Sequence, residues 1–299
     1  MAQTFMNRIV LLLLTFGFHF SITEGQINLS KTNRSLIKKI ESTDGLVSLW
    51  KFNEKAGKDR KSAVHKRFSL KESNGTVARI NEGPLSGFSI SLDGTNYLTL
   101  DHSQTGQLNI YGERCEITMV AWIKWTGVQT GFVGGMWNEY QDGGKRQYGL
   151  FISLPHYNGK DKVCGHISRT GKPTPPFPYS IDYSASRQDV PKNEWCTVAF
   201  TYDGTYIKSY LNGEFEAREA ELISNTKGFD GYPDGLVQIK NPYFFPYGIG
   251  NNGSDFTVGA VLLKSGMGNF FKGLIGGLAV FKRALSENEI KSISYIKDL

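Results

Sequence analysis

The sequence predicts an all-β protein, a two-sheet antiparallel sandwich that ends in a short C-terminal helix. Residues 195–202 and 206–211 alternate apolar and polar side chains with the two-residue period of a half-buried strand. The Asp203-Gly204 pair between them is typical of a tight hairpin turn, and Asn212-Gly213 marks a second turn. Such alternation fits a sheet with one face on a core and the other face open.

Similar strand-like blocks follow one another along the chain, at residues 45–54, 88–97, 117–125, 195–216, 255–260 and 273–286. They include Trp195-Cys-Thr-Val-Ala-Phe-Thr-Tyr-Asp-Gly204, Ile117-Thr-Met-Val-Ala-Trp-Ile-Lys-Trp125 and a closing Arg283-Ala-Leu-Ser286. In this order the blocks resemble laminin-G-like domains, which are concanavalin-A-like lectin/glucanase jelly rolls. The resemblance implies a jelly roll that binds or cleaves polysaccharides. Two acidic positions of the family's closing block are Gly276 and Gly277 here, so no role of those acids carries over.

The chain divides into three predicted parts. Residues 1–25 resemble a signal peptide, because Arg8 precedes an apolar core at 9–20 and small residues precede Gln26. Residues 26–44 form a polar lead-in, and residues 45–299 form the jelly-roll domain. We therefore expect a secreted protein, extracellular or periplasmic.

Two short helices are predicted at the ends of the domain. Residues 35–41 of the lead-in can form one short helix. Ser286 and Glu289 have the spacing of a capping box, which opens a C-terminal helix whose Ile290 and Ile293 face the domain. After the signal segment no apolar run approaches the length of a membrane-spanning helix, so we expect no membrane insertion.

The charge balance favours an acidic partner. The sequence has 34 Lys and Arg against 28 Asp and Glu, a net charge of +6. In a secreted β protein this excess favours an acidic polysaccharide. The alternative is an ordinary solvated basic surface, since no Lys/Arg run is dense. We expect a monomer with no nucleic-acid partner.

Three cysteines permit at most one internal disulfide bond. Cys164 and Cys196 are expected on neighbouring strands but on opposite faces, whereas Cys115 and Cys196 share a face. The pairing stays open.

Two long segments are expected to carry function, since long loops in compact domains usually do. One is Arg169–Asn193, which is rich in proline and holds Tyr179 and Tyr183. The other is Phe215–Ser254, with the aromatic run 243–247. Proline stiffens such loops, which suits a preformed wall beside a groove.

Strand alternation predicts a sugar platform. With Val198 and Phe200 toward the core, Trp122, Lys208 and Tyr210 point the other way, and His166 is expected on the same face. Trp and Tyr rings stack on the C–H faces of sugars, and a cation holds a carboxylate or sulfate.

Two function classes compete on this platform. One is a polysaccharide lyase that cleaves a uronate-containing, sulfated or ulvan-like polymer by β-elimination; alginate and glycosaminoglycan-like polymers fit as well. Elimination needs a base, an acid and a group that neutralises the carboxylate. The predicted catalytic set is His166, Tyr210 and Arg146, and the predicted substrate contacts are Trp122, Lys208, Arg169, Tyr148 and Tyr183. The other class is a non-catalytic lectin-like module, and adhesion through the 243–247 run is a third interpretation.

No cofactor is required by either class, but structural Ca²⁺ is an option that the family resemblance raises. Its predicted ligands are Asp93, Asn96 and Asp255, whose oxygens lie in turns. The competing interpretation is ordinary turn chemistry.

Overall fold

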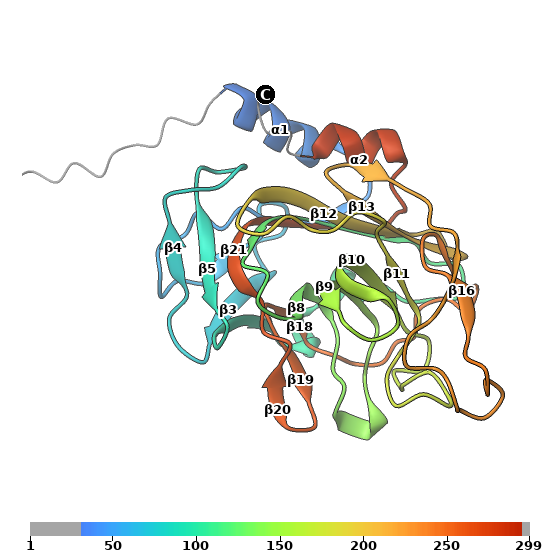
Figure 1. Cartoon of the computed structure of the whole chain (residues 1–299). Helices are drawn as coiled ribbons and strands as arrows, with labels where there is room; N and C mark the ends of the chain where they lie inside the picture. Colours follow the sequence, from blue (N-terminus) through green and yellow to red (C-terminus); the bar gives the residue numbers. More distant parts are fainter. Residues whose placement is uncertain (1–30, 295–299) are drawn as a thin grey trace, which may run out of the picture.

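The computed structural model describes residues 31–294 and arranges them in two large antiparallel sheets packed face to face (Figure 1). This confirms the predicted sandwich. The predicted signal peptide, residues 1–25, lies outside the described residues. Among the described helices, none is long and apolar enough to cross a membrane.

The first sheet contains the predicted hairpin and the closing block. In spatial order its strands are β14 (Glu214–Phe215), β13 (Tyr206–Leu211), β12 (Trp195–Tyr202), β7 (Ile117–Trp125), β21 (Lys272–Phe281), β5 (Ser89–Asp93) and β4 (Ala78–Ile80), with β1 (Leu46–Trp50) beside β21 and β17 (Tyr243–Phe244) beside β13.

The second sheet contains the strands that carry the candidate site. In spatial order they are β11 (Tyr183–Ala185), β10 (Gly159–Ile167), β9 (Tyr148–Leu154), β8 (Gly131–Met136), β18 (Phe256–Val258), β6 (Tyr97–Leu100), β3 (Ser69–Ser73) and β2 (Arg60–Lys61).

Smaller elements surround the two sheets. The helices and the paired short strands are α1 (Lys31–Ser42), α2 (Glu287–Ile293), three 3₁₀ turns (His102–Gln104, Gly106–Leu108, Gln141–Gly143), β15 (Ala220–Leu222) with β16 (Val237–Ile239), and β19 (Val261–Leu263) with β20 (Gly266–Gly268). Both predicted helices are present. α2 begins at the predicted capping box, and Ile290 and Ile293 are fully buried.

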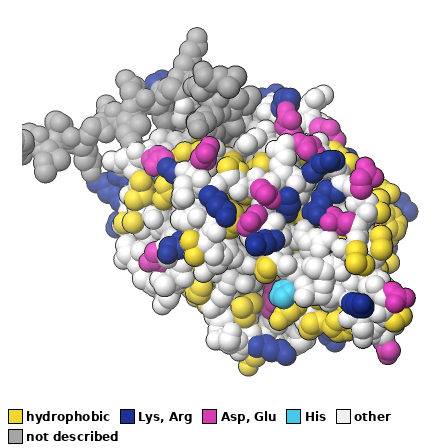
Figure 2. All heavy atoms as spheres, in the orientation of Figure 1, with side chains coloured by type: hydrophobic (Ala, Val, Ile, Leu, Met, Phe, Trp, Pro, Cys, Tyr) yellow, Lys and Arg dark blue, Asp and Glu magenta, His cyan; other side chains and the backbone are white. Residues whose placement is uncertain are grey.

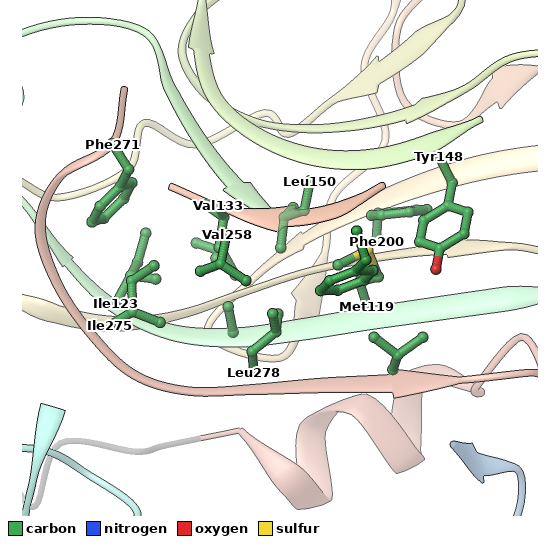
Figure 3. Packing of buried hydrophobic residues seen from close by; sticks show 14 of the residues in the cluster. Met119, Ile123, Val133, Tyr148, Leu150, Phe200, Val258, Phe271, Ile275 and Leu278 are labelled. Atoms are coloured by element: carbon green, nitrogen blue, oxygen red, sulfur yellow. The ribbon is translucent and has the colours of Figure 1, made fainter. Parts of the chain in front are cut away.

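The main core lies between the two sheets. Figure 3 shows Met119, Phe200 and Leu278 of the first sheet meeting Leu150 and Val258 of the second. Val198 and Phe200, which the alternation of side chains predicted to face inward, both belong to this core. A side chain cannot replace Gly165 of β10, since a Cβ there would lie 2.4 Å from the Cβ of Phe200.

Each sheet also buries its outer face. The helices cover the first sheet (Figure 1), where Trp122 and Tyr210 pack with Ile290 in a second cluster. Loops cover the second sheet, where Trp137, Phe151 and other aromatic side chains form a third cluster. The sandwich therefore has three packed layers of side chains instead of one.

The predicted shared platform is wrong for a topological reason. His166 does point away from the core, as expected, but β10 belongs to the second sheet, whereas Trp122, Lys208 and Tyr210 lie on the first. The outer faces of two stacked sheets point in opposite directions. His166 and the other three residues therefore lie on opposite sides of the sandwich.

The three cysteines are all free thiols. Cys115 precedes Ile117, which pairs with Tyr202, whereas Cys196 pairs with Ile123. The two thiols are therefore separated by roughly 25 Å along the strands, at about 3.4 Å per residue. Burial raises the pKa of Cys164 and of Cys196 to about 12, which keeps both thiols protonated and unreactive.

Candidate functional site

The outer face of the second sheet holds a pocket of about 290 Å³. Strands β9 to β11 and the residues that flank β8 form its floor, and the segment after β10 contributes one wall. Its lining is mainly aromatic with a few polar groups: Thr130, Trp137, Glu139, Phe151, Leu154, Pro155, His156, Tyr157, His166, Tyr179, Ser180, Tyr183, Leu263 and Asn269. An apolar cavity with a small number of polar groups is the usual form of a small-ligand site.

The floor is built from rings on adjacent strands. The ring centroid of His166 lies 4.4 Å from that of Trp137 and 5.0 Å from that of Tyr183. Gly149 of β9 leaves the space that these rings use, because a Cβ there would lie 2.9 Å from the Phe132 ring and 3.5 Å from the Trp137 ring. The floor is therefore a continuous aromatic surface.

The rim carries a stacked pair. The rings of His156 and Tyr179 lie 5.0 Å apart with an angle of 23° between their planes, and Tyr179 is 50% exposed. Tyr179 belongs to the proline-rich segment, which Phe177 anchors against the rings of Tyr157 and Phe229. That segment supplies a wall of the pocket, as the sequence predicted.

Glu139 brings a carboxylate to the pocket, and that carboxylate is already paired. The indole N–H of Trp137 donates to one oxygen at 2.9 Å, and the guanidinium of Arg146 donates to the other at 3.1 Å. Arg146 also donates to the carbonyl of Gly171 at 3.0 Å and is almost fully buried. Among the described residues that line the pocket, Glu139 is the only Asp, Glu, Lys or Arg.

His166 is a neutral imidazole in this environment. Burial, with the positive charges of Lys240 and Arg146 nearby, holds its pKa well below the usual range. Its Nδ1 atom is buried and has no hydrogen-bond partner among residues 31–294. An unpaired buried nitrogen costs free energy unless a ligand or water meets it.

A buried lysine lies behind the pocket wall. The ammonium of Lys240 sits 3.7 Å from the ring centroid of Tyr183 and 4.6 Å from that of Tyr243, and it donates to the carbonyl of Ile181 at 2.9 Å. Burial lowers its pKa to about 7. Tyr183 is thus fixed between His166 on the pocket side and Lys240 behind it.

The structure brings together some of the predicted site residues. His166 and Tyr183 line the pocket, and Arg146 reaches it through Glu139. Tyr148 does not, because its side chain points into the main core, where its hydroxyl donates to the carbonyl of Leu108 at 2.6 Å. Arg169 lies beyond the end of β10, outside the pocket lining, with its guanidinium 3.8 Å from Glu113.

The remaining three predicted residues lie on the far side of the sandwich. Trp122 and Tyr210 are buried beneath the helices. The ammonium of Lys208 lies 3.9 Å from the carboxylate of Glu287 in α2. None of the three can act together with His166.

Side-chain oxygens of the predicted calcium ligands already accept hydrogen bonds from the protein. Asp93 Oδ1 accepts hydrogen bonds from Thr95 and from the backbone of Asn96. Asp255 Oδ1 accepts the backbone N–H of His102 at 2.8 Å. Within the described part of the chain, no group of three or more His, Cys, Asp or Glu side chains is placed to hold a metal ion.

Several pocket residues were not predicted from the sequence. Trp137 and Glu139 follow β8 directly, and His156 and Tyr157 form the turn between β9 and β10. Their one sequence signal is the density of aromatic residues at strand ends, which is weak without the sheet order.

Comparison with known proteins places the fold in a family. The family model described as the concanavalin A-like lectin/glucanases superfamily matches residues 92–291. Among curated proteins, none matches the sequence. Domain 4 of the extracellular arabinanase AbnA from Geobacillus stearothermophilus, solved in complex with arabinotriose, has a similar structure. The TM-score is 0.51 at 17% identity, over 83% of this chain and 97% of that one.

Two further solved structures align less well. The CBM40 domain of Ruminococcus gnavus IT-sialidase, bound to α2,3-sialyllactose, has a TM-score of 0.46 at 18% identity, over 70% of this chain and 96% of that one. The sialidase of Trypanosoma rangeli has a TM-score of 0.47 at 13% identity, over 88% of this chain and 37% of that one. At 17% identity, the likeness to the arabinanase domain shows the fold alone.

Proposed function

Because the chain belongs to the concanavalin A-like lectin/glucanase superfamily, we propose that its aromatic pocket binds a carbohydrate. The observation that carries this proposal is the half-exposed ring of Tyr179, held by His156 at the rim of the pocket. The C–H face of a sugar ring stacks on such an aromatic face. A ring that is already held in place loses little side-chain entropy when it binds.

The polar groups of the pocket suit sugar hydroxyls. Glu139 can accept hydrogen bonds, and Ser180 and Asn269 can both donate and accept them. Aromatic stacking would supply the affinity and these groups the orientation.

An uncharged sugar fits the pocket better than an acidic one. The lining has no Lys or Arg, and Arg146 is already paired with Glu139. A uronate or sulfate here would face the carboxylate of Glu139 without a free cation. The acidic polysaccharide expected from the net charge is therefore not assigned to this pocket.

Calorimetric titration with a panel of neutral and acidic oligosaccharides tests the proposal. We expect saturable binding of at least one neutral oligosaccharide, with an affinity that changes little between low and high salt. Absence of binding across the whole panel, or binding of acidic members alone, would contradict it.

A lyase is the second candidate, and one observation favours it. His166 is held neutral next to Tyr183, which is the protonation state that a general base needs. Against this, the hydroxyl of Tyr183 already donates to the backbone carbonyls of His156 and Tyr157. A rise in absorbance near 235 nm when the protein is mixed with a uronate polymer, and its loss in His166→Ala, would support β-elimination. If the absorbance does not rise, the lyase is excluded for that polymer and the non-catalytic binding module is favoured.

We also propose that the protein acts outside the cytoplasm, because residues 1–25 resemble a signal peptide. N-terminal sequencing of the protein from culture medium or periplasm of its host should give Gln26 first. An intact Met1 in the cytoplasmic fraction would refute the secretion.

A further inference from the structure

Most of the protein's excess positive charge lies in one short segment. Residues 51–67 hold seven Lys or Arg and two Asp or Glu, a net charge of +5, against +6 for the whole sequence. The segment contains β2 and leads into β3, at one edge of the second sheet. On the face shown in Figure 2, positive and negative side chains are interspersed.

A buried arginine fixes the shape of this segment. The guanidinium of Arg60 is fully buried, and it donates to the carbonyls of Lys55 and Lys58 and to the carboxylate of Glu72. The same carboxylate accepts the backbone N–H of Gly57 at 3.0 Å. With two of its carbonyls held inward, the loop keeps one conformation while the side chain of Lys58 stays in solvent.

An open hollow lies beside the loop, and several cations line it: Lys55, Lys58, Lys61 and Arg79. Lys58 and Lys61 are exposed, and within residues 31–294 no ion pair joins them or Arg79 to a carboxylate. Arg79 lies 4.3 Å from the ring centroid of Phe88, which holds its guanidinium in place.

The two acids of the hollow are engaged elsewhere. Glu54 accepts the backbone N–H of Lys61 at 2.9 Å, and Asp59 accepts the hydroxyl of Ser69 at 3.0 Å. Glu54 thus holds the backbone of the loop and Asp59 joins the loop to β3, and among the residues that the structure describes no ion pair joins either of them to Lys58 or Lys61. The hollow therefore presents a net positive charge to solvent on a loop that is already ordered.

We propose that this hollow binds the sulfate or carboxylate groups of an acidic polysaccharide. Lysine and arginine bind such groups through charge-assisted hydrogen bonds, and an ordered loop reduces the entropic cost. The choice of a polysaccharide, among polyanions, rests on the proposed carbohydrate function of the pocket. Lys61 of the hollow lies in β2 and Phe151 of the pocket in β9, two strands of the second sheet that are separated by five strand steps, or roughly 25 Å at about 4.8 Å per step, whereas Arg79 of the hollow lies in β4 of the first sheet. A polysaccharide that carries both neutral and acidic sugars is long enough to span this distance, which a free anion is not.

Binding of dextran sulfate, with unsulfated dextran as reference, tests the hollow. The test variant is the full-length mature protein with Lys58→Glu and Lys61→Glu. The charge-matched control carries Lys227→Glu and Lys282→Glu, two exposed lysines away from the hollow. At low salt we expect the test variant to bind dextran sulfate about tenfold more weakly and the control to stay within about twofold, since exposed ion pairs each contribute modestly. Equal melting temperatures would show that both variants fold.

Other outcomes would overturn the proposal. Equal weakening in the two double variants would mean that only overall charge matters. The protein should bind dextran sulfate more tightly than double-stranded DNA or phosphatidylserine vesicles when all three are measured at the same ionic strength. Equally tight binding of either would contradict the assignment to a polysaccharide. Tyr179→Ala separates the two sites, because it should leave dextran sulfate binding unchanged. If the unsubstituted protein binds dextran sulfate but no neutral oligosaccharide, the pocket proposal is refuted and the hollow proposal stands.

Discussion

The rings of Tyr179 and His156 stack at the mouth of the pocket, 5.0 Å apart and 23° from parallel, although 22 positions separate the two residues in the sequence. One comes from the proline-rich segment and the other from the turn between β9 and β10. Their contact joins a loop to the sheet and leaves the outer face of Tyr179 open.

Tyr179→Ala should weaken binding of a neutral oligosaccharide about tenfold, since an aromatic contact contributes about 1 kcal/mol beyond the buried area. Tyr179→Phe should keep most of the affinity, because the ring and its stacking remain. Tyr111→Ala is the matched control, as Tyr111 is 53% exposed and lies outside the pocket lining. Calorimetry measures all three, and equal affinities of Tyr179→Ala and Tyr111→Ala would exclude the stacking role.

The buried His166 should make the protein less stable in mild acid. Below pH 6.5 the unfolded chain binds a proton that the buried imidazole does not, because the folded pKa is lowered. The free energy of unfolding should then fall by up to about 1.4 kcal/mol per pH unit from pH 6.5 toward pH 5. Urea unfolding at several pH values measures this slope.

His166→Phe removes that proton and should flatten the slope between pH 5 and 6.5. The control variant is His156→Ala, at an exposed histidine, and it should leave the slope unchanged. An unchanged slope in His166→Phe would assign the acid sensitivity to other groups.

The alternation of side chains was enough to predict the sandwich and its core. A two-residue period fixes which side chains share a face of a strand, so Val198 and Phe200 were placed correctly. The same period also places Tyr148 on the core-facing side of β9, together with the buried Leu150 and Ile152. The period says nothing about which sheet a strand joins.

That missing information explains the error in the predicted site. His166 lies in β10 and Tyr210 in β13, and these strands belong to different sheets, so the assignment of the two residues to one face was wrong. The loop around Tyr179 and Tyr183 was predicted better, because its length and prolines are signals that do not depend on sheet order. The basic segment 51–67 was missed because Glu54 and Asp59 interrupt its run of cations.

Lys240 should make stability rise with pH above neutrality. The folded pKa is about 7 and the reference value is 10.5, so between these values the unfolded chain binds the proton and the folded chain does not. The free energy of unfolding should increase by up to about 1.4 kcal/mol per pH unit between pH 7.5 and 9.5. Lys240→Met should remove this slope, although it leaves the carbonyl of Ile181 unpaired. A slope that persists in the variant would contradict the lowered pKa.

Arg60 should contribute far more to stability than the neighbouring Lys61. The guanidinium of Arg60 is fully buried and bonds to Glu72 and to three backbone carbonyls, whereas Lys61 is exposed. Removing one partner of a buried ion pair costs about 3–5 kcal/mol, and an ordinary surface substitution costs about 0.5 kcal/mol or less. Arg60→Gln should therefore lower the urea midpoint strongly, and Lys61→Gln should not. If the two variants unfold at the same urea concentration, Arg60 does not hold the basic loop in place.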